Sequence, residues 1–138
     1  MSLVYPSTHP LVHHQTAILR DSRTRPPEFR RLVRSLAGLL AREATTELST
    51  QPVEITTPLG PASCRTLAET IGIVPILRAG LGMAEGVLDL IPDAEVWHIG
   101  LYRDEQTLLP QEYYCKLPKR PRVTLALVVD PMLATGGS

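Results

Sequence analysis

The segment VVDPMLATGGS combines a carboxylate with a glycine-rich loop at residues 128–138. Gly136 and Gly137 can adopt positive φ and have no Cβ to keep a ligand away from the backbone. Successive N–H groups in such a loop can bind an anion, and the hydroxyls of Thr135 and Ser138 add donors. Asp130 would repel a phosphate, but it can accept hydrogen bonds from sugar hydroxyls or bind a metal. A sugar phosphate satisfies both requirements.

The pattern alone leaves a second interpretation open, in which the strand ends in an Asp-Pro turn and an ordinary glycine-rich loop follows. The loop matches neither the Walker pattern G-x-x-x-x-G-K-[ST] nor the dinucleotide pattern G-x-G-x-x-G. A helix starting just beyond Ser138 would complete a phosphate site with its amino terminus. The sequence stops at that residue.

Two arginines follow other apolar segments that are typical of strands. Arg78 comes after IGIVPIL, and Arg103 comes near the end of AEVWHIGLYR. In open α/β sheets, ligands bind beyond the carboxyl ends of the strands, which places both arginines beside the Asp130 loop. A guanidinium group can bind a diphosphate with two parallel hydrogen bonds. Either arginine taken alone would be interpreted as a surface or ion-paired residue.

The elements that must position these groups follow from periodicity and turn residues. A cap at Thr8 or His9 with Pro10 in the first turn predicts a helix over residues 8–20, and apolar residues at three- and four-residue steps predict a second helix over about 27–48. The remaining expectations are an edge strand or hairpin within 51–67, strands at 71–77, 94–103 and 123–130, a loop and helix over 78–91, and a long polar loop over 101–114. This order predicts an α/β fold, a mostly parallel sheet flanked by helices. The strand VTLALVVD is expected at the centre, covered on both faces.

Length and composition set limits on organisation and partners. The 138 residues suit a single domain, with amino-terminal helices within residues 1–50 and the ligand-binding core within 70–138. Fourteen basic residues balance fourteen acidic ones, which argues against bulk binding to nucleic acid or membrane. No apolar segment has the roughly 20 residues that span a bilayer, and the start lacks a secretory pattern.

Other chemistry-bearing residues have simpler interpretations. Cys64 and Cys115 have no metal-binding spacing and are too few for a disulfide framework, so we expect reduced cysteines in a cytosolic protein. The arginines of the second predicted helix indicate a solvated face, with an RNA-binding face as the alternative; they are Arg30, Arg31, Arg34 and Arg42.

Four segments together resemble one family. LVVDPMLATGGS is similar to the signature with which type I phosphoribosyltransferases bind 5-phosphoribosyl 1-diphosphate (PRPP), in the form found in uracil phosphoribosyltransferases. HPLVHHQTAILRD, VPILRAGLGMAEGVL and HIGLYRDEQTLLPQEYYCKLP resemble that family in the same order. The signature of the wider family usually carries two adjacent acidic residues. Here Pro131 stands at the position of the second acid, which narrows the resemblance to the uracil phosphoribosyltransferases.

The resemblance implies a role for each matching residue. It implies that Asp130 binds the ribose hydroxyls and that Arg103 reaches the pyrophosphate group from a mobile loop. The pyrophosphate group would also be bound by Arg78, Ala79 and Gly80, and the 5′-phosphate by Ala134, Thr135, Gly136, Gly137 and Ser138. No side-chain metal site is implied, because Mg²⁺ would arrive bound to PRPP.

The resemblance also implies a reaction, in which N1 of uracil displaces pyrophosphate from C1 of PRPP to give UMP. It implies a cytoplasmic homo-oligomer with no nucleic-acid or membrane partner. The fold would be incomplete at the carboxyl end, without the segment that recognises uracil. VTLALVVD would then be left with an uncovered face and an open apolar edge, so we expect residues 1–138 alone to be inactive and prone to aggregation. The alternatives are a non-catalytic regulator that senses PRPP or binds RNA on the same fold, and an inactive fragment.

Overall fold

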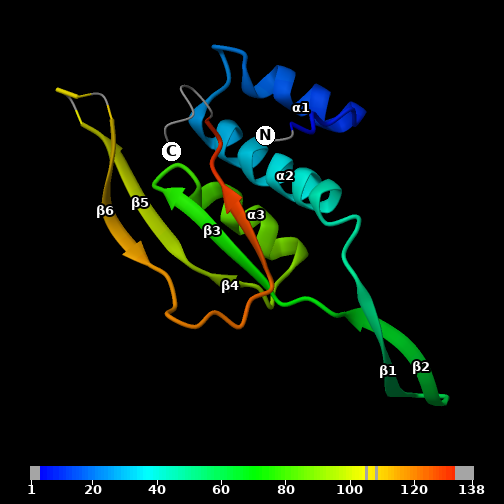
Figure 1. The fold of residues 1–138 in the computed structure, drawn as a ribbon. Coiled ribbons are helices and arrows are strands. Elements are labelled where there is room, and N and C mark those ends of the chain that lie inside the picture. The colour runs from blue at the N-terminus through cyan, green and yellow to red at the C-terminus, as the bar shows by residue number, and fades with distance from the viewer. Residues whose placement is uncertain (1–3, 105, 108, 133–138) are drawn as a thin grey trace.

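The computed structural model describes residues 4–104, 106–107 and 109–132. Among them it contains three helices and seven strands, shown in Figure 1. The helices are α1 (Pro10–Leu19), α2 (Pro26–Ala44) and α3 (Leu81–Leu90); the strands are β1 (Thr50–Thr57), β2 (Gly60–Leu67), β3 (Ile71–Leu77), β4 (Glu95–Val96), β5 (His98–Arg103), β6 (Pro110–Lys116) and β7 (Leu125–Val129).

The main sheet is built around β3. Strands β4 and β5 pair with one edge of β3 and β7 pairs with the other, all in parallel. Strand β6 adds to β5 in the antiparallel direction. The carboxyl ends of β3, β5 and β7 therefore point to the same edge of the sheet. This arrangement confirms the predicted α/β class with a mostly parallel sheet.

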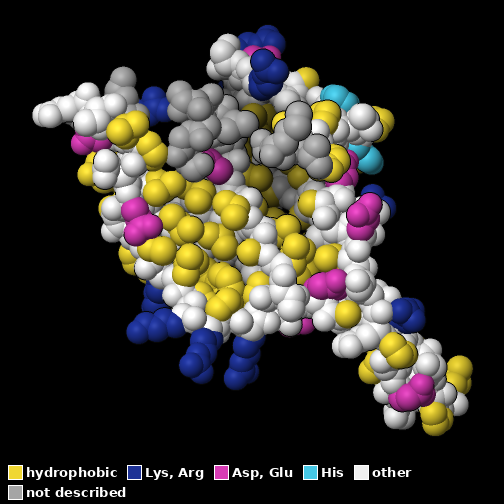
Figure 2. Space-filling view, viewed as in Figure 1, with side chains coloured by type: hydrophobic (Ala, Val, Ile, Leu, Met, Phe, Trp, Pro, Cys, Tyr) yellow, Lys and Arg dark blue, Asp and Glu magenta, His cyan; other side chains and the backbone are white. Residues whose placement is uncertain are grey.

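The position of β7 matches the expectation for residues 1–138 alone. The strand has the apolar sequence of a central strand, but among the described residues it pairs only with β3 and forms an edge of the sheet. Leu127 and Val129 pack toward the helices, whereas Val128 is 64% exposed. Figure 2 shows hydrophobic side chains gathered on the sheet face that the helices leave uncovered. The open edge and the exposed Val128 were therefore expected for residues 1–138 alone.

Helices α2 and α3 cover the other face of the sheet. The apolar stripe of α2 is confirmed, since Leu32, Val33, Ala37 and Ala41 are buried. At Gly86 of α3, an added Cβ would collide with the carbonyl oxygen of Arg34, so the two helices touch backbone to backbone. Helix α2 ends four residues before the predicted boundary at Leu48. The hydroxyls of Thr45 and Thr46 bond to carbonyls of the last turn there and compete with continuation of the helix.

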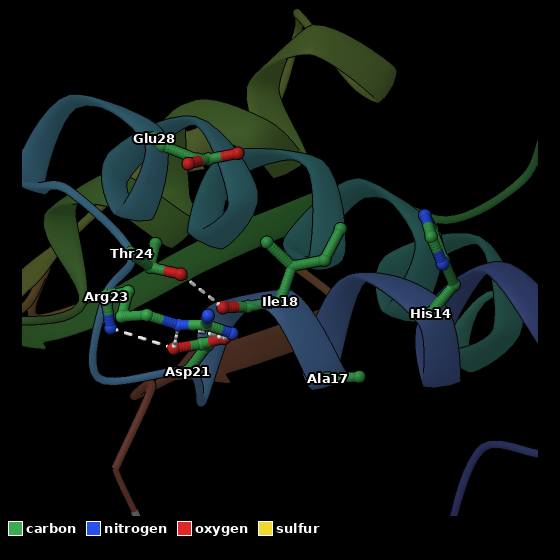
Figure 3. A pocket seen from close by; sticks show the side chains of 7 residues that line it. All are labelled: His14, Ala17, Ile18, Asp21, Arg23, Thr24 and Glu28. Atoms are coloured by element: carbon green, nitrogen blue, oxygen red, sulfur yellow. Dashed lines mark hydrogen bonds and ion pairs between the residues drawn. The ribbon is translucent and has the colours of Figure 1, made fainter.

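The connection between α1 and α2 is organised by short polar contacts (Figure 3). Asp21 forms an ion pair with Arg23 at 2.6 Å, and the hydroxyl of Thr24 donates to the carbonyl of Ile18. Helix α1 has Pro10 in its first turn, as predicted, and its N-cap is His9, one of the two predicted cap residues. The segment DSRT thus ends α1 and starts the turn into α2.

Residues 50–67 form the hairpin that was one of the two predicted possibilities. Strands β1 and β2 pair antiparallel from Thr50 with Leu67 to Thr57 with Gly60, and the hairpin projects away from the rest of the chain (Figure 1). Gly60 has a φ of 127°, which favours glycine at the end of the turn.

Candidate functional site

Three of the predicted site residues lie at the carboxyl edge of the sheet. Pro75 of β3 pairs with Val129 of β7, so Arg78 and Asp130 follow neighbouring strand ends. Leu77 pairs with Gly100 of β5, and β5 continues to Arg103. By this register Arg78 lies beside Leu101. Arg103 is two residues farther along β5, a distance of about 7 Å in the strand direction.

The loop after β3 touches the end of β7 at Gly80. The Gly80 amide donates to the carbonyl of Ile76 at 2.8 Å. An added Cβ at Gly80 would collide with the carbonyl oxygen of Val129 and lie 2.8 Å from the backbone nitrogen of Ile76. Only glycine leaves room for this approach. The approach places the Arg78 loop beside the residue that precedes Asp130.

The same loop leads directly into the amino terminus of α3. Gly80 is the N-cap residue, and its carbonyl accepts hydrogen bonds from Met83 and Ala84. The first turn of α3 contains no acidic residue, so the positive end of the helix dipole is not neutralised there by the helix itself. Arg78 and Ala79 are exposed immediately before it. The loop therefore offers a cation and a helix amino terminus to an anion.

Asp130 is half-buried at the start of the segment after β7. Its Oδ1 accepts a hydrogen bond from the Met132 amide at 3.2 Å. Among the described residues, its Oδ2 has no hydrogen-bond partner, so one carboxylate oxygen is available to ligand hydroxyls. The predicted 5′-phosphate residues Ala134, Thr135, Gly136, Gly137 and Ser138 lie outside the described residues.

The long polar loop predicted over residues 101–114 is wrong, because Pro110 already begins β6, and Arg103 lies in the strand predicted over residues 94–103. It is the last residue of β5 and pairs with Pro110, the first residue of β6. The turn between the strands closes at Asp104, whose amide donates to the carbonyl of Leu109 at 3.0 Å. Strand β6 is exposed along its length and rich in polar residues, so its sequence has no buried alternation to distinguish it from a loop.

Asp104 holds the turn that follows Arg103. Its Oδ1 accepts hydrogen bonds from the amides of Gln106 (3.0 Å) and Thr107 (2.7 Å) and from the Thr107 hydroxyl (2.9 Å). The Thr107 amide, then the Thr107 hydroxyl and the Gln106 amide, lower the pKa of the Asp104 carboxyl from its ordinary value of 3.8. These bonds favour the ionised form, and protonation removes them.

We expect this turn to lose its carboxylate contacts when the pH falls below 3.8. Because the folded-state pKa is lowered, the contribution is complete above pH 3.8 and is lost as the pH falls through the lower folded value. Carbon-detected NMR should give a titration midpoint below 3.8 for the Asp104 carboxyl, and Thr107→Ala should move it upward. A midpoint at or above 3.8 in the unsubstituted chain would show that the turn is not held in this way.

A cavity of about 690 Å³ separates the β3 loop from the β5–β6 hairpin. Its lining residues are Leu77, Arg78 and Ala79 on the loop side and Leu101, Tyr102 and Tyr113 on the hairpin side. None of them is acidic, so the one formal charge among the described lining residues is the guanidinium of Arg78. Sequence reasoning missed both tyrosines. Two features of the sequence could have indicated them. Tyr102 directly precedes the predicted site residue Arg103, and Gly100 leaves space on the same strand for a large neighbouring side chain.

Other parts of the described chain offer weaker candidates. The hollow between α1 and α2 (Figure 3) is lined by Asp21 and Arg23, which neutralise each other. On α2, Arg34 forms ion pairs with Asp89 at 2.6 Å and Glu85 at 3.3 Å, which weakens the RNA-binding interpretation of that helix. Within the described ranges, no group of three or more His, Cys, Asp or Glu side chains could hold a metal ion. Nor does any helix there have the length and apolar character needed to cross a membrane.

The fold is that of an α/β protein, and its candidate anion-binding groups follow neighbouring parallel strands. Its sequence matches the profile of the family described as uracil phosphoribosyltransferase over residues 6–138. The chain belongs to the uracil phosphoribosyltransferase family.

Individual relatives agree with this assignment. A uracil phosphoribosyltransferase of Roseiflexus castenholzii is 56% identical over 138 residues, and one of Clostridium beijerinckii is 53% identical over 139 residues. Each match covers the whole of this chain and 66% of the relative, so the chain spans a little under two thirds of their length. Among solved structures, the AQ2163 protein from Aquifex aeolicus superposes with a TM-score of 0.90 at 35% identity. That superposition covers 98% of this chain and 65% of the other.

Proposed function

We propose that this chain supplies the PRPP-binding part of an enzyme that transfers the phosphoribosyl group from PRPP to uracil, giving UMP and pyrophosphate. The observation that carries the proposal is the close approach at Gly80, which brings the Arg78 loop against the strand end that precedes Asp130. Membership of the family supports the same reaction.

Each side chain has a physical task in this reaction. The guanidinium groups of Arg78 and Arg103 bind the diphosphate and stabilise the negative charge that grows on it as the bond to C1 breaks. Asp130 accepts hydrogen bonds from the ribose hydroxyls and fixes the sugar relative to the leaving group. The enzyme holds PRPP and uracil in line, which replaces a bimolecular encounter in solution. N1 of uracil is itself the nucleophile, so no side-chain nucleophile is required.

Magnesium enters this proposal as part of the substrate. The described residues provide no three-ligand acidic or histidine group, and Asp130 is the one carboxylate placed among the proposed PRPP ligands. That donor set fits Mg²⁺ carried on the oxygens of PRPP, where the metal would neutralise charge on the diphosphate. The chain's own residues then need only bind the complex.

The setting of the enzyme is also proposed. We place it in the cytoplasm as a homo-oligomer, without nucleic-acid or membrane partners. The balanced formal charge and the paired Arg34 support the absence of a nucleic-acid partner. Two exposed cysteines, Cys64 and Cys115, are both unpaired, which suits a reducing compartment.

UMP synthesis tests the proposed reaction. The protein to assay is a fused chain, residues 1–138 continued by the part of the Roseiflexus castenholzii relative that lies beyond the match. With Mg-PRPP it should convert uracil to UMP, and Arg78→Ala should abolish that conversion. A folded fused chain that binds Mg-PRPP without forming UMP would favour a non-catalytic PRPP-binding protein instead.

Residues 1–138 alone should give a different result in the same assay. Strand β7 is the sheet edge in the described residues, and its Val128 is 64% exposed. An open apolar edge strand favours pairing with other chains. We expect this polypeptide to aggregate and to make no UMP; a monodisperse, active preparation would contradict that expectation.

A further inference from the structure

The geometry points to Tyr102 and Tyr113 as the hairpin-side wall of the groove that takes the diphosphate group, with Gly100 and a β-bulge setting Tyr113 in place. This inference rests on the proposed function, because it assumes that Arg78 binds the diphosphate from the opposite wall. It assigns a ligand contact to Tyr102 and Tyr113 and a positioning role to Gly100.

The bulge is visible in the register of β5 and β6. Gly100 pairs with Tyr114, whereas the next residue, Leu101, pairs with Glu112. Tyr113 is therefore the extra residue on β6. Bulges of this kind redirect a side chain and are common beside active sites.

The bulge seats the ring of Tyr113 on Gly100. A Cβ added at Gly100 would lie 2.6 Å from Cζ of Tyr113 and 2.8 and 2.9 Å from the two Cε atoms. Such distances exclude any larger residue at position 100 unless the ring moves away. Gly100 thus provides the space that the ring occupies.

The seated ring also meets Tyr102. The two ring centroids are 6.2 Å apart with the planes tilted by 51°, a geometry typical of aromatic pairs. Both rings line the cavity that Arg78 lines from the other side, and they remain 53% and 54% exposed. Within the described part of the chain, neither phenol hydroxyl has a hydrogen-bond partner, so both are available as donors.

The chemistry of this cavity suits a diphosphate. Its lining combines a guanidinium, two phenol hydroxyls and apolar side chains, and its volume of about 690 Å³ can hold a small ligand. Hydroxyl donors add to the bidentate contact of Arg78 without bringing a second formal charge. The ring surfaces exclude water, which would otherwise compete with uracil as the nucleophile.

Fluorine NMR tests whether the tyrosines contact the diphosphate. The fused chain is labelled with 3-fluorotyrosine, and signals are assigned with single Tyr→Phe variants. Mg-pyrophosphate should shift the signals of Tyr102 and Tyr113, whereas ribose 5-phosphate, which lacks the diphosphate, should shift neither. Tyr114 is the matched control, because it is adjacent in sequence but lines a different cavity, with Trp97 and His98.

A double-mutant cycle tests the role of Gly100. Gly100→Ala displaces the Tyr113 ring and should weaken Mg-pyrophosphate binding about tenfold, as Tyr113→Ala should. In the Tyr113→Ala background, Gly100→Ala should have no further effect, because the ring it would displace is absent. Equal losses in both backgrounds would show that Gly100 supports only the fold and would overturn the positioning role.

The outcomes separate this inference from the proposed function. If Arg78→Ala abolishes pyrophosphate binding while the signals of Tyr102 and Tyr113 stay unmoved, the tyrosine wall is wrong and the proposed function stands. If Arg78→Ala leaves the affinity unchanged and the fused chain makes no UMP, the proposed function fails and this inference fails with it.

Discussion

Gly80→Ala is expected to destabilise the folded chain by about 3–5 kcal/mol and to eliminate PRPP binding. The added Cβ would collide with the carbonyl oxygen of Val129 and crowd the backbone of Ile76. These contacts are backbone atoms of two neighbouring strands, so no rotation of a side chain relieves them. The loop must move away from β7, which separates Arg78 from Asp130.

Gly82→Ala is the matched control for this substitution. A Cβ at Gly82 would meet Cγ1 of Val33 at 3.5 Å, an ordinary contact, and position 82 is inside α3. Alanine is a better helix former there and should stabilise the chain by about 0.5–1 kcal/mol. Urea unfolding of both variants in the fused chain gives the comparison. Equal stability of the Gly80→Ala and unsubstituted chains would mean that the loop does not pass this close to β7.

Asp130→Asn is expected to weaken Mg-PRPP binding roughly 30- to 800-fold, which corresponds to about 2–4 kcal/mol. The amide has nearly the shape of the carboxylate but lacks its charge, so hydrogen bonds from the ribose hydroxyls become weaker. The fold should be unaffected, because within the described residues the one hydrogen bond of this side chain comes from the Met132 amide, and the asparagine oxygen can accept it as well.

Asp93→Asn provides the control for the loss of one negative charge. Asp93 is exposed between α3 and β4, at the amino-terminal edge of the sheet. Calorimetric titration with Mg-PRPP should give unchanged affinity for this variant. The same affinity for Asp130→Asn would remove Asp130 from the site.

Much of the fold could be predicted because its elements carry local signals. Pro10 and the residue before it set the start of α1, and three- and four-residue apolar spacing predicted the buried face of α2. Strand β6 was missed because it is exposed throughout and has no buried alternation. The open edge of β7 was predicted from the family resemblance and not from the strand itself, because an apolar segment does not encode which of its faces is covered.

The candidate site, too, could be predicted only in part. Arg78 and Asp130 were predicted because the carboxyl-edge rule needs only the order of strands, which the sequence indicates. Tyr102 and Tyr113 were missed because their placement depends on a one-residue bulge in the pairing of β5 with β6. No local sequence pattern indicates such a register shift, and without the shift the ring of Tyr113 would not lie over Gly100.

The location of bound PRPP on the fused chain tests the central claim most directly. Backbone amide NMR during titration with Mg-PRPP should show shifts at residues 78–81, at Arg103 and around Asp130, with the β1–β2 hairpin unchanged. Shifts confined to the hollow between α1 and α2, with residues 78–81 and Asp130 unmoved, would contradict the assignment of the carboxyl edge of the sheet as the PRPP site.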